Sequence, residues 1–256
     1  MSRKLQIISL VLALAVVSQM LSPALAAVTI SGDTDISSFE IQAGINGVGT
    51  LRIDAGSSQT TGSLRLGTQQ FGVGFATVTG AGSQLILTNS NFTEIGQGGF
   101  GRLEILNGGL VNLSGTSGSM RIGGGTGCCG GSPFGTVIVD GPGSLLTIGN
   151  DLIVGSNGTG TLQIQNGAMV NAVQSQTQVN AVSRIEMNGG LLRISQLDND
   201  GVVRGSGEIN VGQLSGNGRF QAGSGQTLKI TGGNSFSNSG IIAADGGEIE
   251  LSSNIF

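Results

Sequence analysis

Residues able to do acid–base chemistry are sparse in this chain of 256 residues. It has no histidine, so the commonest general base and any Ser-His-Asp arrangement are excluded. Carboxylates that cleave a polysaccharide must lie close together as a pair. On outward strand positions, Glu186 and Glu208 are the nearest such pair in sequence, and ordinary solvated acids are the simpler interpretation. The other acids are mostly isolated, as at these positions: Asp54, Glu94, Glu104, Asp140 and Asp151. We therefore predict no catalytic residue and no enzyme.

Metal and phosphate sites also lack their usual residues. Asp198-Asn-Asp-Gly201 resembles part of a calcium loop, but the first position of that loop would be Gln196 and the last Gly207 instead of Glu. Lys229 follows Gly225-Gln-Thr-Leu, which is not a phosphate-binding loop. A tight surface turn explains the acidic cluster more simply. The sequence thus predicts no metal-binding residue, no cofactor-binding residue and no cofactor.

The two cysteines, Cys128 and Cys129, are adjacent within a glycine-rich segment. A disulfide between neighbouring residues strains ordinary trans geometry, and two thiols without histidine do not complete a zinc site. The simplest interpretation is the tip of a surface loop. A vicinal disulfide and an intermolecular bridge remain open alternatives.

Residues 1–26 are predicted to be a cleaved signal peptide. Arg3 and Lys4 precede an apolar run from Leu5 to Val17, and Ser22-Pro-Ala-Leu-Ala26 supplies a small-x-small cleavage site. The alternative is a membrane anchor, but the uninterrupted apolar run is shorter than the roughly 20 residues that span a bilayer. We expect a secreted or cell-surface bacterial protein whose mature chain has no membrane span.

The charge of the mature chain argues against polyanionic partners. Two of the 11 basic residues lie in the predicted signal peptide, which leaves 9 basic and 15 acidic residues, a formal charge of −6. Nucleic acids and anionic lipids are bound by basic clusters. We expect neither as a partner, and regard cell-surface or matrix polysaccharide or protein as the candidates. The sequence leaves the oligomeric state open.

A phrase led by glycine recurs along the chain. Its copies are Gly49-Thr-Leu-Arg-Ile53, Gly101-Arg-Leu-Glu-Ile105, Gly135-Thr-Val-Ile-Val139, Gly160-Thr-Leu-Gln-Ile164 and, less cleanly, Gly207-Glu-Ile-Asn-Val211. A second phrase falls between them, as Ser63-Leu-Arg-Leu-Gly67, Ser119-Met-Arg-Ile-Gly123 and Leu152-Ile-Val-Gly155. The leading glycines Gly49 and Gly74 are 25 residues apart, as are Gly135 and Gly160. Such repetition predicts a stack of similar units.

Within each unit, apolar and polar residues alternate. Leu51 and Ile53 share one face of a strand while Arg52 faces the other way, which is the period of two expected for half-buried strands. Corner residues such as Asn107-Gly108 and Asn166-Gly167 accept positive φ angles. Corners that close hairpins would give a sandwich. The matching strands about one unit apart and the absence of helical crossovers favour parallel stacking instead.

The sequence therefore predicts an all-β fold, a single-stranded parallel β-helix, or β-solenoid, of about ten coils. After the signal peptide, residues 27–46 would form an N-terminal cap or first coil. Residues 47–195 would form the glycine-led coils. Residues 196–256 would form more divergent coils and end within a repeat.

The stretch Gly149-Asn-Asp-Leu-Ile-Val-Gly155 and the following Ser156-Asn-Gly-Thr-Gly-Thr-Leu-Gln-Ile-Gln-Asn-Gly-Ala168 resemble repeats of bacterial autotransporter passenger domains and other exported β-helix proteins. The resemblance covers roughly residues 47–195 and implies a right-handed β-helix displayed or released outside the cell. Its repeats occur in proteins of many roles. We expect a structural or adhesive surface protein; the alternatives are a β-helix similar to polysaccharide lyases or hydrolases, and an inactive passenger fragment that lacks a C-terminal barrel or sorting tail.

Overall fold

The computed structural model has only β-strands as secondary-structure elements in the part of the chain that it describes. It describes residues 27–37, 39–88, 92–113, 118–125 and 132–252, and these contain 23 strands and no helix. The predicted signal peptide, residues 1–26, lies outside the described residues, as do Cys128 and Cys129. Almost all strand pairs are parallel, and all strands belong to one sheet. The predicted all-β class is confirmed.

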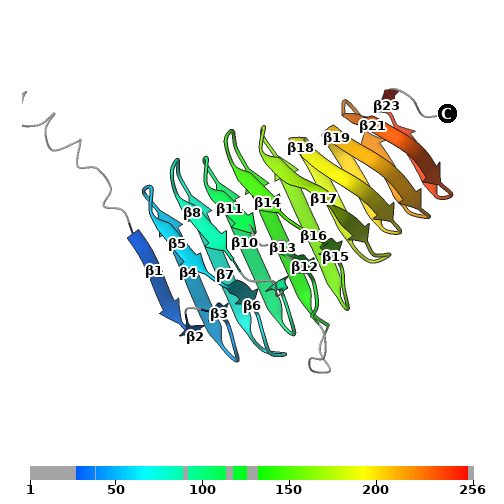
Figure 1. Ribbon diagram of the computed structural model, residues 1–256. Coiled ribbons are helices and arrows are strands. Elements are labelled where there is room, and N and C mark those ends of the chain that lie inside the picture. The colour runs from blue at the N-terminus through cyan, green and yellow to red at the C-terminus, as the bar shows by residue number, and fades with distance from the viewer. Residues whose placement is uncertain (1–26, 38, 89–91, 114–117, 126–131, 253–256) are drawn as a thin grey trace, which may run out of the picture.

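The strands pair in three long parallel ladders. In Figure 1, the successive strands of each ladder follow one another from blue to red. Ladder 1 begins with the longer strands β4 (Val48–Asp54), β7 (Val73–Thr79), β10 (Phe100–Leu106), β13 (Phe134–Asp140) and β16 (Thr159–Gln165). It continues through the first residues of β18 (Arg184–Asn199) and β19 (Val202–Gly216) to β20 (Arg219–Gly223) and β22 (Ile241–Asp245).

Ladder 2 consists of β5 (Ser58–Thr61), β8 (Gln84–Leu87), β11 (Leu110–Leu113), β14 (Leu145–Ile148), the start of β17 (Met169–Val179), the middle of β18 and β19, the start of β21 (Thr227–Asn238) and β23 (Glu248–Ser252). Ladder 3 consists of β3 (Glu40–Ala43), β6 (Ser63–Leu66), β9 (Thr93–Ile95), β12 (Met120–Ile122), β15 (Leu152–Val154) and the last residues of β17, β18, β19 and β21.

The repeated phrase stacks in register, as predicted. Along ladder 1, Gly49 pairs with Gly74, Gly74 with Gly101, Gly101 with Gly135, and Gly135 with Gly160. The apolar residues that follow these glycines consequently form continuous inward rows. Every second residue of a ladder thus points inward and the others outward.

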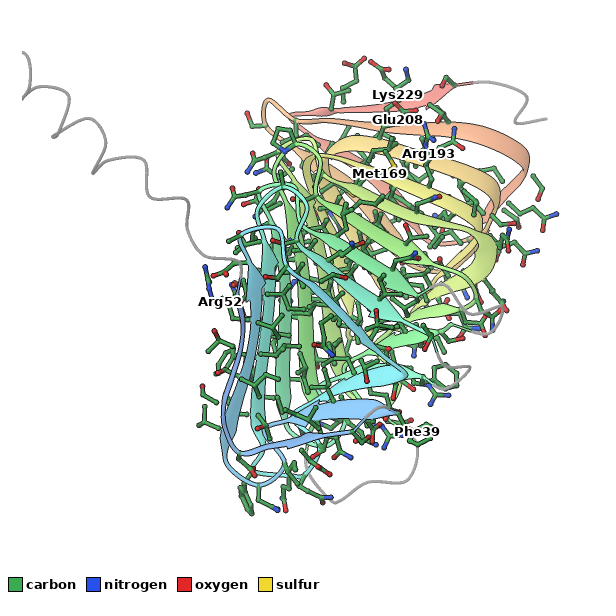
Figure 2. The ribbon with its side chains drawn as sticks, turned by 60° about the vertical axis from the view of Figure 1, so that its left-hand side comes forward. Phe39, Arg52, Met169, Arg193, Glu208 and Lys229 are labelled. Carbon is green, nitrogen blue, oxygen red and sulfur yellow. The ribbon has the colours of Figure 1, made fainter. Side chains whose placement is uncertain are left out.

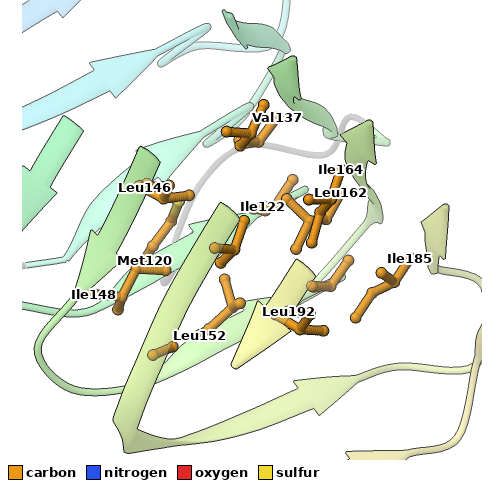
Figure 3. Close-up of a cluster of buried hydrophobic side chains, with 14 of the residues drawn as sticks. Met120, Ile122, Val137, Leu146, Ile148, Leu152, Leu162, Ile164, Ile185 and Leu192 are labelled. Atoms are coloured by element: carbon orange, nitrogen blue, oxygen red, sulfur yellow. The ribbon is translucent and has the colours of Figure 1, made fainter. Parts of the chain in front are cut away.

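The three inward rows enclose one core (Figure 3). Val137 and Leu162 enter it from ladder 1, Leu146 from ladder 2, and Met120 and Leu152 from ladder 3, and all five are fully buried. Removing a side chain of this size from water contributes about 1.5–3 kcal/mol. The aliphatic rows are therefore the main source of stability along the stack.

The leading glycine of the repeated phrase is required because its position has no room for a side chain. A Cβ on Gly135 would lie 2.1 Å from the carbonyl oxygen of Ile95 and 2.3 Å from the backbone nitrogen of Gly123. These atoms belong to the end of ladder 3, so the glycine allows ladders 1 and 3 to meet closely at their shared corner. The corner between ladders 1 and 2 uses positive φ instead, at Asn107 (54°) and Gly108 (84°).

The first strands run against the rest. β1 (Ala27–Gly32) pairs antiparallel with β4, and β2 (Thr34–Ile36) pairs antiparallel with β3. These two strands cover the N-terminal edges of ladders 1 and 3. Asp33 lies between them, and its carboxylate accepts the backbone N–H groups of Asn46 and Gly47.

The repeat becomes shorter in the C-terminal half. β18 and β19 each run through all three ladders without a separate turn, and Arg184 of β18 pairs with Val202 of β19, only 18 residues later. The register shifts between Asn188 and Gly190, where an extra residue bends the strand. In this half, the outward side chains that lie next to each other on neighbouring strands are therefore separated by fewer residues in the sequence than in the first half.

Candidate functional site

A polar groove of about 500 Å³ lies on the outward face of ladder 1 in this shorter-repeat half. Its charged residues are Glu186 and Arg204. The remaining polar lining consists of primary amides: Gln163, Gln165, Asn188, Gln221 and Gln226. We refer to this site as the amide groove.

Four neighbouring strands each supply one side chain to a single row of the groove. Gln163 of β16 pairs with Glu186 of β18, Glu186 with Arg204 of β19, and Arg204 with Gln221 of β20. All four face outward because their apolar neighbours fill the core. Three spacings of about 4.8 Å make the row about 14 Å long.

Glycines form part of the floor. Gly205 has a φ of 112°, and a Cβ there would lie 1.9 Å from the carbonyl oxygen of Met187. Gly223 lines the groove as well, and its N–H donates to Oε1 of Gln226 at 2.8 Å. Because neither glycine carries a side chain, peptide groups line the groove at these points.

Glu186 is the centre of a hydrogen-bonded cluster. Its Oε2 accepts from Nε2 of Gln163 at 3.0 Å, and its Oε1 accepts from Nε of Arg184 at 2.8 Å and from the guanidinium of Arg204. Partial burial opposes ionisation, but the hydrogen bond and charge of Arg204, together with those of Arg184, outweigh it and lower the pKa of Glu186. Glu186 is therefore an ionised acceptor and is poorly suited to act as a general acid near neutral pH.

Glu208 does not join this cluster. It lies on ladder 2, at the strand position opposite Lys229, and accepts a hydrogen bond from the Thr231 hydroxyl at 3.0 Å. Figure 2 shows it beside Lys229 near the C-terminal end. The pair of acids weighed from the sequence is thus divided between two ladders, and Glu186 is the one acid among the described residues that lines the amide groove.

Most of the other acids have local partners. Asp54 and Glu104 bind the arginine two residues before each, Asp140 accepts from Asn166, and Asp198 and Asp200 accept from Ser215 and Asn217. The Asp198–Gly201 segment therefore holds neighbouring strands together. In the part of the chain that the structure describes, no three histidine, cysteine, aspartate or glutamate residues gather as a metal site.

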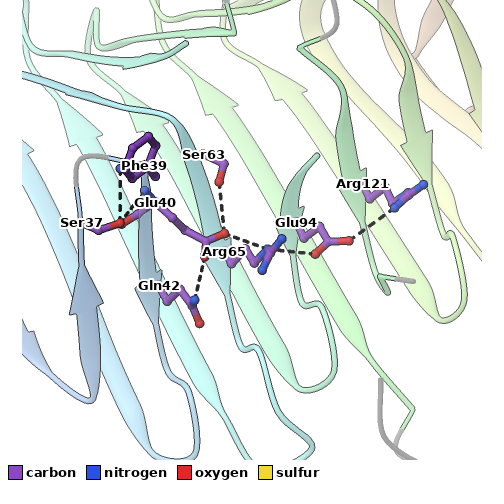
Figure 4. Close-up of polar contacts among 8 residues, drawn as sticks. All are labelled: Ser37, Phe39, Glu40, Gln42, Ser63, Arg65, Glu94 and Arg121. Atoms are coloured by element: carbon purple, nitrogen blue, oxygen red, sulfur yellow. Dashed lines mark hydrogen bonds and ion pairs between the residues drawn. The ribbon is translucent and has the colours of Figure 1, made fainter. Parts of the chain in front are cut away.

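A second charged cluster follows the outward side of ladder 3 (Figure 4). The Nε atom of Arg65 lies 2.9 Å from Glu40 and 3.3 Å from Glu94, and Arg121 lies 3.5 Å from Glu94 on the next strand. Glu94 is buried, with 3% of its surface exposed, and the Arg121 guanidinium stacks on the Phe92 ring at 3.2 Å. This cluster joins strands β3, β6, β9 and β12.

Sequence reasoning treated Glu94 as an isolated acid and missed this cluster. The signal was present in the second repeated phrase. Arg65 and Arg121 occupy the same position of that phrase, and Thr93-Glu94-Ile95-Gly96 is an unrecognised copy between them with Glu94 at that position. Alternating charges at equivalent positions of stacked units predict ion pairs between strands.

Half-exposed phenylalanines line the earlier part of ladder 1. The ring centroids of Phe75 and Phe100 are 5.8 Å apart, and those of Phe100 and Phe134 are also 5.8 Å apart with nearly parallel rings. Such stacking on successive strands reinforces their pairing. None of these rings lines the amide groove.

The described residues include no helix that could cross a membrane. Comparison of the chain with protein-family models, with curated proteins and with solved structures finds no match.

Proposed function

We propose that this chain is a right-handed parallel β-helix that is exported from a bacterial cell and serves as a structural or adhesive surface protein. Three parallel ladders around one aliphatic core support the β-helix. The sequence of residues 1–26 and the resemblance of the repeats to autotransporter passenger domains support export. The partner would be a polysaccharide of a cell surface or matrix.

The amide groove carries the binding part of this proposal. Its lining combines five primary amides with a carboxylate whose two oxygens already accept three donors. Amides both donate and accept hydrogen bonds, as sugar hydroxyls do. Several weak sites on many displayed copies would give firm attachment through multivalency.

Glu186 is ionised and already accepts three hydrogen bonds, which favours binding over catalysis. A glycoside hydrolase or lyase requires a second group placed to exchange a proton with the substrate. Glu208 lies on another ladder, at the strand position opposite Lys229. A carbohydrate-binding role therefore accounts for the groove better than a carbohydrate-cleaving one.

Sedimentation with insoluble polysaccharides tests the proposal. The full chain would be expressed in a bacterial host, recovered from the exported fraction and mixed with cellulose, chitin, xylan and bacterial cell-wall material. We expect retention on at least one of them, without release of reducing sugar, and an N-terminus at Ala27 or Val28. Cytoplasmic retention would overturn export, and release of oligosaccharide from a polysaccharide would overturn the binding-only role.

A further inference from the structure

We propose that the amide groove is a binding site for an uncharged oligosaccharide that lies along the stacking direction of ladder 1. This inference rests on the proposed function, and it adds the chemical class of the ligand, its orientation and the residues that contact it.

The charges of the groove favour an uncharged ligand. The two charged side chains that line it, Glu186 and Arg204, are paired with each other. Just beyond, Asp245 is held by Arg219 at 3.0 Å and by Gln221 at 2.7 Å. An added carboxylate or sulfate would compete with Glu186 for its arginine, whereas a hydroxyl group can use the remaining guanidinium N–H groups.

Several hydrogen-bonding groups remain available to a ligand. The side-chain amides of Gln165 and Asn188 make no hydrogen bond to another residue that the structure describes. Gln163 and Gln221 each give an N–H to a carboxylate, which leaves their carbonyl oxygens as acceptors. The Arg204 side chain is 52% exposed and retains donors. The row thus offers a ligand both acceptors, at Gln163 and Gln221, and donors, at Arg204.

Repetition sets the direction of the ligand. The side chains of the row come from successive strands and follow the stacking axis for about 14 Å. This extended row suits several units of a linear sugar chain better than a single sugar. Among the described residues, no aromatic side chain lines the groove to stack on a sugar ring, so each site should bind weakly.

Glu186 would act as a positioning residue. It holds the side chains of Gln163 and Arg204 in one arrangement, so that their remaining polar groups are fixed before a ligand arrives. Arg204 and Gln165 would contact the ligand directly. These two roles predict different results when the residues are changed separately and together.

Isothermal titration of the purified chain with cellohexaose, xylohexaose and maltohexaose, and with hexagalacturonate as a charged comparison, tests the site. We expect saturable 1:1 binding of a neutral hexaose, with the charged one at least tenfold weaker. Arg204→Ala should weaken binding about tenfold and Gln165→Ala about threefold. Arg52→Ala is the matched control, because Arg52 lies outward on ladder 1 outside the groove and pairs with Asp54.

Combination of the variants separates positioning from a general loss of structure. Glu186→Gln should weaken binding, and the loss in Glu186→Gln with Arg204→Ala should be smaller than the sum of the two separate losses, because Glu186 acts partly through Arg204. Tighter binding of hexagalacturonate, additive losses, or neutral binding unchanged by Arg204→Ala and Gln165→Ala would overturn the proposal. If no hexaose binds but an insoluble polysaccharide retains the chain, only the proposed site is overturned. If no hexaose binds and no insoluble polysaccharide retains the chain, the proposed function is overturned as well.

Discussion

Arg65 and Glu94 form an ion pair between neighbouring strands β6 and β9, with 3.3 Å between Nε and Oε2. Glu94 is almost completely buried, and Arg121 approaches it from the other side. A buried carboxylate between two arginines contributes to stability only while its partners remain, because an unpaired charge is costly to bury.

Glu94→Ala should therefore destabilise the fold by about 1–3 kcal/mol, since Arg121 loses this carboxylate whereas Arg65 still has Glu40 at 2.9 Å. The matched control is Glu104→Ala, whose partner Arg102 lies on the same strand and is partly exposed; its cost should stay below about 1 kcal/mol. Urea unfolding followed by circular dichroism measures both. Equal midpoints for the two variants would contradict the importance of the buried cluster.

Gly135→Ala should destabilise the fold by about 1–3 kcal/mol or more, because the new Cβ would lie 2.1 Å from the Ile95 carbonyl oxygen. Gly47→Ala is the control, since its Cβ would be no closer than 3.5 Å to any neighbour. Thermal unfolding of the two variants should differ clearly. A Gly135→Ala protein with wild-type stability would show that ladders 1 and 3 meet less closely than described.

Leu162→Ala should cost about 2–5 kcal/mol, because Leu162 is fully buried and its removal leaves a cavity in the aliphatic core. Val182→Ala removes a side chain that is 69% exposed and should change the free energy of unfolding by less than about 0.5 kcal/mol. Denaturant titration distinguishes them. Similar small losses would place Leu162 outside the core.

Acid should destabilise the N-terminal end of the fold, because it protonates Asp33. The backbone N–H groups of Gly47 and Asn46 hold the pKa of Asp33 below its ordinary value of 3.8. A carboxylate with a lowered pKa stabilises the fold above its ordinary pKa, and this contribution is lost as the pH falls through the lowered value.

Asp33→Asn should remove that dependence. The stability of the wild-type protein should fall more steeply between pH 4 and pH 2 than that of the variant, whereas at pH 7 the wild type should be the more stable. Urea midpoints recorded across this range provide the measurement. Parallel curves for the two proteins would mean that Asp33 has the same pKa in the folded and unfolded states.

The inner architecture was readable from the sequence because its signals are local and repeated. Leu51 and Ile53 alternate with polar neighbours, and Gly49, Gly74 and Gly101 recur at similar intervals, so strand, inward face and stacking partner could all be predicted. The apolar pattern alone is enough to predict the inward rows, since any aliphatic side chain of suitable size can fill a core position.

The outward surface was decided only by the tertiary structure. An interval of 25 residues would align Glu186 with Val211, but β18 and β19 pass their corners without turns and bring Arg204, 18 residues later, to its side. Glu94 likewise meets Arg65 and Arg121 only because three units of unequal length return to one register. The alternating pattern determined which residues face outward; the lengths of the corners determined which of them meet, and therefore where a groove could form.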